Sequence, residues 1–193
     1  MNGDFTKTKY IIRKKFFKVL GASFHIFDDA GNLCFFVKQK AFKLKEDIRV
    51  YSDESLADEL LLIQARKVID FSSEYDVVDS HSGERIGALK RKGFKSMIKD
   101  EWLIFDSQNA EVGKICEDSM LMALLRRFLT SLIPQTFEGT IGGAGVFTFK
   151  QKFNPFVQRI VLDFGEDTAN RLDRRMGIAA AVLLSAVEGR QNN

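Results

Sequence analysis

Cysteine is scarce in this sequence. Cys34 and Cys116 are the only two among 193 residues, and they lie far apart without a CxxC spacing. This scarcity excludes a disulfide framework and a cysteine-rich metal site. We therefore expect two reduced thiols that are buried as small hydrophobic side chains, as is typical of a cytoplasmic protein.

Long hydrophobic runs are also missing. No segment reaches the roughly 20 apolar residues that a membrane-spanning helix needs, and the N-terminal MNGDFTKTKY lacks the apolar region of a signal peptide. We therefore expect a cytoplasmic protein that is not an integral membrane protein, with peripheral attachment to a membrane left open.

Residue patterns for catalysis are absent as well. The sequence has no GxSxG, HExxH or nucleophile–base pairing, and His25 and His81 lack metal ligands at a suitable spacing. We place His25 in a strand and His81 in a turn. The stretch GTIGGAGVF (139–147) lacks the Lys-Ser or Lys-Thr of a phosphate loop and predicts a hairpin turn. We expect no enzyme activity, no catalytic residues, no metal and no cofactor.

The composition is that of a folded globular protein. Hydrophobic residues make up 45% of the chain and charged residues 28%, with a formal net charge of +3. Eighteen Phe and only two Pro indicate strands packed on an aromatic interior. We expect one domain over residues 1–193. The weak positive charge permits contact with nucleic acid or an anionic membrane but argues for neither.

A hairpin repeats along the chain. The bulky residues Phe24, Ile48, Tyr75 and Trp102 are separated by 24, 27 and 27 residues. Each is followed four residues later by a polar residue that is suited to a turn, in the order Asp28, Ser52, Asp79, Asp106. This regular spacing predicts tandem antiparallel hairpins and about twelve strands in total.

Two helices are predicted between and after these hairpins. An amphipathic helix is expected over about 119–133, and a second helix over about 168–188, beginning near Asp167 or Thr168. Met176–Val187 is apolar on every side and about 18 Å long as a helix, which is short for a hydrocarbon core of about 30 Å. A closed barrel of roughly twelve strands would leave an interior that such a helix can fill. We therefore favour a mainly β fold, a closed antiparallel barrel around a central C-terminal helix, over a membrane segment.

These segments resemble a known family. The tandem hairpins, the stretches VVDSHSGERIGALKRK (77–92) and WLIFDSQNAEVGKI (102–115), and the terminal hydrophobic helix are similar to LURP-one-related proteins, which share the Tubby C-terminal and phospholipid scramblase fold. The resemblance implies a twelve-stranded barrel around a C-terminal helix. It also implies a non-enzymatic role in binding anionic phospholipid or phosphoinositide surfaces. The helix at about 119–133 is an insertion in this pattern, and Tubby's phosphoinositide-contact motif has no match residue by residue.

Basic residues spaced two apart recur on the predicted strands. Residues two apart share a face of a strand, so each pair faces solvent if the intervening side chain faces the core. The pairs are Arg13 with Lys15, Lys38 with Lys40, Lys90 with Lys92, and Lys150 with Lys152. They form either a solvated outer wall or a site for an anionic surface. The densest cluster and our candidate headgroup site is Lys90, Arg91, Lys92, Lys95 and Lys99.

Alternatives to lipid binding remain open at this point. The amphipathic helix at 119–133 could dock on the barrel, which we favour, or lie in a membrane interface. It also supports a rival function, a protein-interaction scaffold in which this helix binds a partner. Scramblase-like lipid transfer and nucleic-acid binding rank below both. A calcium site formed by Asp163, Glu166, Asp167 and Asp173 competes with helix capping, which explains most of these acids.

Overall fold

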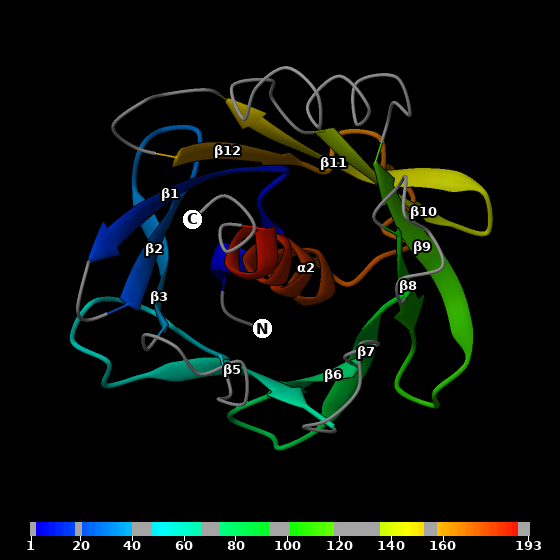
Figure 1. Ribbon diagram of the computed structural model, residues 1–193, viewed down its shortest axis with the longest axis horizontal. Coiled ribbons are helices and arrows are strands. Elements are labelled where there is room, and N and C mark those ends of the chain that lie inside the picture. Colours follow the sequence, from blue (N-terminus) through cyan, green and yellow to red (C-terminus); the bar gives the residue numbers. More distant parts are fainter. Residues whose placement is uncertain are drawn as a thin grey trace.

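The strands of this protein close into a barrel. A computed structural model describes residues 3–17, 21–39, 48–66, 74–92, 101–117, 136–152 and 158–188. In these residues the strands follow one another in chain order, each antiparallel to its neighbours, and the last pairs with the first (Figure 1). The predicted closed antiparallel barrel of about twelve strands is confirmed. The strands are β1 (Lys9–Phe17), β2 (Gly21–Phe27), β3 (Leu33–Gln39), β4 (Ile48–Tyr51), β5 (Glu59–Ala65), β6 (Glu74–Asp79), β7 (Arg85–Arg91), β8 (Glu101–Phe105), β9 (Glu111–Glu117), β10 (Thr136–Ile141), β11 (Ala144–Lys152) and β12 (Gln158–Asp163).

The repeat in the sequence corresponds to the hairpins of the barrel. Its four bulky residues lie on β2, β4, β6 and β8 and are all buried. The polar residues four positions later end the same strands, as predicted. Asp106 shows the reason, because its carboxylate accepts the backbone N–H groups of Gln108 and Ala110, each at 2.9 Å, and so fixes the turn.

The glycine-rich stretch forms a hairpin turn, as predicted. Ile141 on β10 pairs with Ala144 on β11, and Gly142 and Gly143 between them have φ angles of 56° and 82°. Two consecutive positive φ angles are what a tight two-residue hairpin requires, and glycine adopts them without steric cost.

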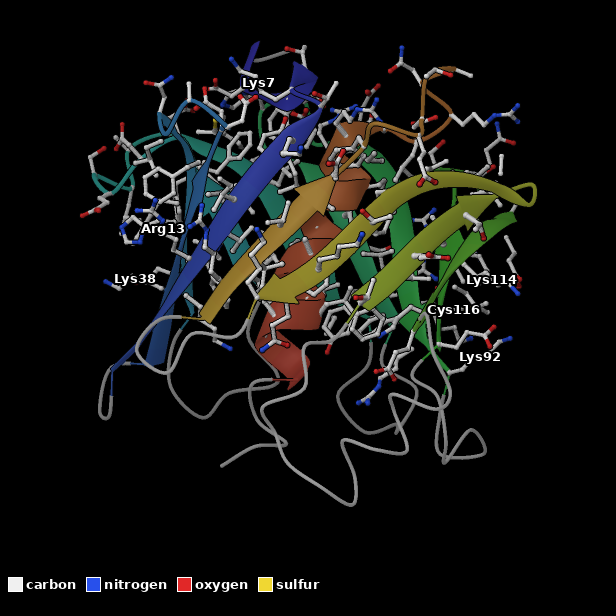
Figure 2. All side chains as sticks on the ribbon, turned by 90° about the horizontal axis from the view of Figure 1, so that it is seen from above. Lys7, Arg13, Lys38, Lys92, Lys114 and Cys116 are labelled. Atoms are coloured by element: carbon white, nitrogen blue, oxygen red, sulfur yellow. The ribbon has the colours of Figure 1, made fainter. Side chains whose placement is uncertain are left out.

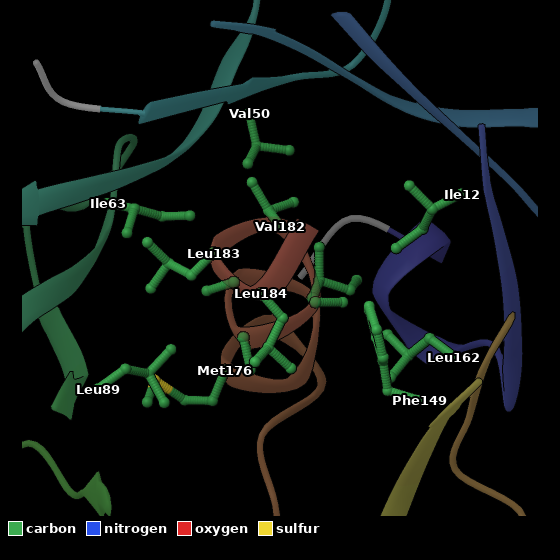
Figure 3. Packing of buried hydrophobic residues seen from close by; sticks show 14 of the residues in the cluster. Ile12, Val50, Ile63, Leu89, Phe149, Leu162, Met176, Val182, Leu183 and Leu184 are labelled. Carbon is green, nitrogen blue, oxygen red and sulfur yellow. The ribbon is translucent and has the colours of Figure 1, made fainter. Parts of the chain in front are cut away.

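One long helix, α2 (Arg174–Glu188), lies inside the ring of strands (Figure 1). Every side chain from Ile178 to Ala186 is at most 3% exposed. In Figure 3, Val182 and Leu183 point toward Val50 and Ile63 of the wall. The small residues of the helix allow this close fit, since a Cβ on Gly177 would lie 2.4 Å from the ring of Phe164.

The helix begins later than the predicted start near Asp167 or Thr168. The carboxylate of Asp167 accepts the backbone N–H groups of Arg171 and Leu172, which holds that segment as a turn, and Asn170 has a positive φ of 48°. Asp173 is the residue that caps the helix, with its carboxylate accepting the N–H of Arg175 at 2.9 Å.

Charged side chains tie both ends of α2 to the barrel. At its beginning, Arg175 Nη1 lies 2.7 Å from the Asp79 carboxylate at the end of β6. At its end, where the last turn has no basic residue of its own, Lys14 of β1 donates a 2.5 Å hydrogen bond to the Ser185 carbonyl. Lys14 is 3% exposed. Its positive charge inside the barrel therefore lies at the negative end of the helix dipole.

A short 3-10 helix, η1 (Gly3–Thr6), contacts α2 near the other end of the barrel. Phe5 of η1 stacks on Phe35 with ring centroids 4.5 Å apart, and the Tyr10 hydroxyl donates a 2.5 Å hydrogen bond to the Asp4 carbonyl. Burial raises the pKa of Tyr10, so the hydroxyl stays a donor at neutral pH.

The two cysteines differ in their surroundings. Both are free thiols, and Cys34 is buried as predicted. The prediction that Cys116 is buried is wrong, because this residue is only partly buried. Its neighbours Ile115 and Glu117 are the buried residues at this end of β9, so the alternation of the strand turns Cys116 to the outer wall.

Some predictions fall outside the described residues. The amphipathic helix expected at about 119–133 lies there and is not described. Within the described part of the chain, no helix is both long enough and apolar enough to cross a membrane.

Truncation of the helix core is expected to destabilise the barrel. Leu183→Ala removes a side chain that is 1% exposed, and we expect it to lower the free energy of unfolding by about 2–5 kcal/mol. Leu62→Ala on the outer side of β5, where the side chain is only partly buried, is the matched control and should cost clearly less. Denaturant unfolding followed by circular dichroism measures both. Equal losses would contradict the placement of α2 in the core.

Acid is expected to weaken the ion pair between Asp167 and Arg174, the first residue of α2. Burial by itself raises the pKa of Asp167, but the amides of Arg171 and Leu172 and the Arg174 guanidinium outweigh it, so this pKa lies below its ordinary value of 3.8. The resulting stabilisation is complete above that value and is lost as the pH falls below it.

Asp167→Asn is expected to remove this part of the acid dependence. The substitution also leaves the buried Arg174 without its carboxylate, and we expect a loss of about 3 kcal/mol at neutral pH. Unfolding measured from pH 7 to pH 3 in both proteins tests this. If the free energy of unfolding falls below pH 4 as steeply in the variant as in the unmodified protein, Asp167 is not a source of the acid dependence.

Candidate functional site

A row of cations crosses the outer wall on three neighbouring strands. Arg13 on β1 is paired with Arg159 on β12, and Arg159 is paired with Lys152 on β11. Lys150 lies two residues from Lys152 on the same side of β11. The alternating residues Ile12, Ile160 and Phe149 are buried, so these cations face outward. We call Arg13, Lys150, Lys152 and Arg159, which are all exposed, the cationic face.

The cationic face carries an unbalanced charge. Among the outward side chains that the structure describes on β11, β12 and β1, five are cations and one is a carboxylate, Asp163. Lys9 forms a 3.0 Å ion pair with that carboxylate. In the described part of the chain, no residue of the cationic face forms an ion pair with a carboxylate, and Arg13 instead lies over the Phe27 ring at 4.6 Å. Exposed cations without a carboxylate are available to an anionic ligand.

The pKa of Asp163 reflects this positive environment. Its partial burial raises the pKa, but the hydrogen bond from the Gly165 amide and the charges of Lys9 and Lys150 outweigh burial. The pKa therefore lies below its ordinary value. Asp163 stays ionised at neutral pH and forms its ion pair with Lys9, and it interacts with Lys150 only at longer range. Among the described residues, Arg13, Lys152 and Arg159 have no ion pair with a carboxylate.

His25 on β2 is the next residue in the row, paired with Arg13. Its side chain is 10% exposed, and its Nε2 lies 2.5 Å from the carboxylate of Glu54 in the turn between β4 and β5. The Phe36 ring packs edge-on against the imidazole, with centroids 5.0 Å apart. The row of exposed cations therefore ends at β2, where His25 and Phe36 are mostly buried.

The sequence-predicted cluster is divided by the structure. Lys90 lies on the outer side of β7, and Lys92 directly follows the strand. Glu74 is 3.7 Å from Lys90, and Glu101 is 2.5 Å from Lys92. Arg91 follows Leu89 on the inner side of the same strand and pairs in register with the buried Trp102. Lys95 and Lys99 lie outside the described residues. The headgroup role of the cluster stays a prediction, but its two described outward lysines are neutralised by neighbouring carboxylates.

The other basic pairs are placed only in part. Lys38 is exposed on β3, on the same side of the barrel as Arg13, whereas Lys92 lies on the opposite side (Figure 2). Lys40 is outside the described residues, and the side chain of Lys15 is not described. The intervening residues Lys14 and Arg91 face inward, although both are charged.

Sequence reasoning missed Arg159. This residue is not part of a basic pair, and it joins the cationic face only because β12 lies between β11 and β1. The strand order that closes the barrel is the signal that would have found it.

Three of the four acids that were considered for calcium have structural partners, and the fourth, Glu166, is exposed. Asp163 pairs with Lys9, Asp167 holds Arg174 at 2.7 Å, and Asp173 caps α2. Among the described residues, no group of three or more His, Cys, Asp or Glu side chains is arranged to hold a metal ion.

Comparison with solved structures identifies the same architecture elsewhere. The chain is similar to an X-ray structure of a protein from Arabidopsis thaliana, with a TM-score of 0.53 and 15% sequence identity. The match covers 93% of this chain and 91% of that chain. At this identity the similarity shows the fold alone. No curated protein sequence matches the chain.

Comparison with protein families gives a more specific result. A family model described as LURP-one-related matches residues 33–134, which is more than half of the chain. The match runs from the first residue of β3 through the whole of β9. The resemblance inferred from the hairpin motifs is confirmed, and this chain belongs to the LURP-one-related family.

Proposed function

We propose that this protein is a non-enzymatic binding protein that attaches to an anionic phospholipid surface through the cationic face. The observation that carries the proposal is the alignment of Lys152, Arg159 and Arg13 on three adjacent strands, without a carboxylate partner in the described residues. The LURP-one-related family and its barrel fold support a binding role. In this proposal α2 is the structural core of the barrel, and the ligand is bound outside.

The geometry of the cationic face suits an extended anionic surface. Neighbouring strands are about 4.8 Å apart, so Lys152 and Arg13 are separated by about 10 Å across Arg159. Charges spread at this spacing can contact several headgroups at once. Each cation near an anionic leaflet contributes about 1 kcal/mol, so four give an attachment of about 4 kcal/mol. Salt should weaken it, because the Debye length is about 8 Å at physiological ionic strength.

The opposite wall is less suited to this role. Glu74 and Glu101 already form ion pairs with Lys90 and Lys92, so a headgroup would have to compete with these carboxylates. The network continues on β5 and β6, where Arg66 pairs with Glu74 and with Asp76 at 2.8 Å. We therefore propose that the cationic face, rather than the outer side of β7, makes the first contact with the membrane.

Neutralisation of the cationic face is expected to weaken binding to anionic vesicles. The double variant Lys152→Gln/Arg159→Gln removes two exposed cations, and we expect a loss of about 2 kcal/mol, or about 30-fold in affinity. Sedimentation with vesicles of phosphatidylcholine alone, or containing phosphatidylserine or a phosphoinositide, measures this across a salt series.

The matched control is Lys90→Gln/Lys92→Gln, which also removes two positive charges but from the wall whose lysines form ion pairs. We expect it to change the affinity by less than about threefold. If the control loses more affinity than Lys152→Gln/Arg159→Gln, the Lys90 cluster and not the cationic face is the binding site. Failure of the unmodified protein to bind anionic vesicles at low salt would contradict the proposed function and favour a protein-interaction scaffold.

A further inference from the structure

An apolar row lies directly beside the cationic face on the outer wall. Val161 on β12 pairs with Ile11 on β1, and Ile11 pairs with Phe27 on β2. These residues are two positions along their strands from Arg159, Arg13 and His25, so all six share the outer side. Val161, Ile11 and Phe27 are each partly exposed. We call these three residues the apolar row.

Charge surrounds the apolar row on most sides. Arg159 and Arg13 border it toward one end of the barrel, and the Lys9–Asp163 ion pair borders it toward the other. Lys150 of β11 is paired in register with Val161 and so borders it along the sheet. The outer wall therefore presents a small apolar centre whose rim holds four cations, Lys9, Arg13, Lys150 and Arg159, and one carboxylate, Asp163.

We infer that the apolar row enters the headgroup region of an anionic bilayer when the cationic face is bound. This inference rests on the proposed function and adds how the same wall holds the membrane. Long basic side chains keep their charges among phosphates while their stems lie along apolar surface, which allows the residues between them to penetrate. Arg13 joins the two parts of this wall, because its guanidinium lies over the Phe27 ring at 4.6 Å and a phosphate bound to Arg13 would therefore lie beside the apolar row.

The charge of the rim selects the occupant of this surface. A protein partner would have to present carboxylates around an apolar centre in one fixed arrangement, whereas an anionic bilayer supplies phosphates beside acyl chains at every position. Insertion adds an apolar contribution to the binding free energy, and salt does not screen this contribution because it does not arise from charge.

Tryptophan quenching by brominated lipid tests the insertion directly. In Phe27→Trp, the new indole should be quenched by vesicles of anionic lipid that carries bromine near the headgroup end of the acyl chain. The native Trp102 is 2% exposed inside the barrel and serves as an internal reference that stays unquenched. The matched control is Phe105→Trp on β8, a partly exposed site on the other side of the barrel (Figure 1).

The inference expects quenching of Phe27→Trp and none of Phe105→Trp. If Phe27→Trp disturbs folding, Ile11→Trp places the probe at the centre of the row. Binding to the vesicles with both probes unquenched would overturn the insertion and leave the proposed function standing. Absence of binding to anionic vesicles would overturn both.

A second variant measures the energy of insertion. Ile11→Ser/Val161→Ser keeps every cation, so its binding at low salt should fall only slightly. At 0.5 M salt, where charge is screened, we expect at least about tenfold weaker binding than the unmodified protein. Circular dichroism confirms the fold of the variant. Equal binding at high salt would show that charge alone attaches the wall and would contradict the insertion.

Discussion

In the 15-residue helix α2, the stretch from Met176 to Ala186 carries only apolar or small side chains and must be covered on all its sides, and the rest of this structure is organised around that requirement. The twelve described strands close around it, and their inward side chains form one cluster with the helix. The fit depends on small residues such as Gly177 and on charges at both ends. Lys14 meets the carbonyl end of the helix, and Arg175 ties its beginning to Asp79.

Because α2 fills the interior, the outer wall of the barrel is the surface that is available to a ligand. For the same reason, most charged side chains lie on the outward positions of the strands. The two sides of the barrel differ in that respect. On β5 to β8 the cations and carboxylates neutralise each other, whereas on β11, β12 and β1 four cations have no ion pair with the described residues. The proposed attachment to an anionic surface follows from this asymmetry and not from a pocket.

The sequence predicted the fold well because the fold depends on local signals. The spacing of Phe24, Ile48, Tyr75 and Trp102 and the turn residues such as Asp106 repeat with each hairpin, and Gly142 and Gly143 mark their own turn. The beginning of α2 was placed too early because two acids, Asp167 and Asp173, both resemble helix caps. Only the structure shows that Asp167 closes a turn before the helix.

The candidate site was predicted only in part because charge compensation is not local in sequence. Arg13, Lys150 and Lys152 were recognised in basic pairs, but Arg159 became part of the row only through the closing of the barrel. The partners of Lys90 and Lys92 lie on the neighbouring strands, so the densest basic run in the sequence is not the least compensated surface. Pattern alone also could not show that Lys14 and Arg91 turn inward.

Hydrogen exchange of the α2 amides, with and without anionic vesicles, tests the central claim most directly. If the barrel encloses the helix and binds membranes with its outer wall, the amides from Ile178 to Leu184 should exchange only through global unfolding and remain the slowest in both conditions. Fast exchange of these amides in the free protein, or a loss of their protection when vesicles are added, would contradict the enclosed helix and the outer-wall attachment built on it.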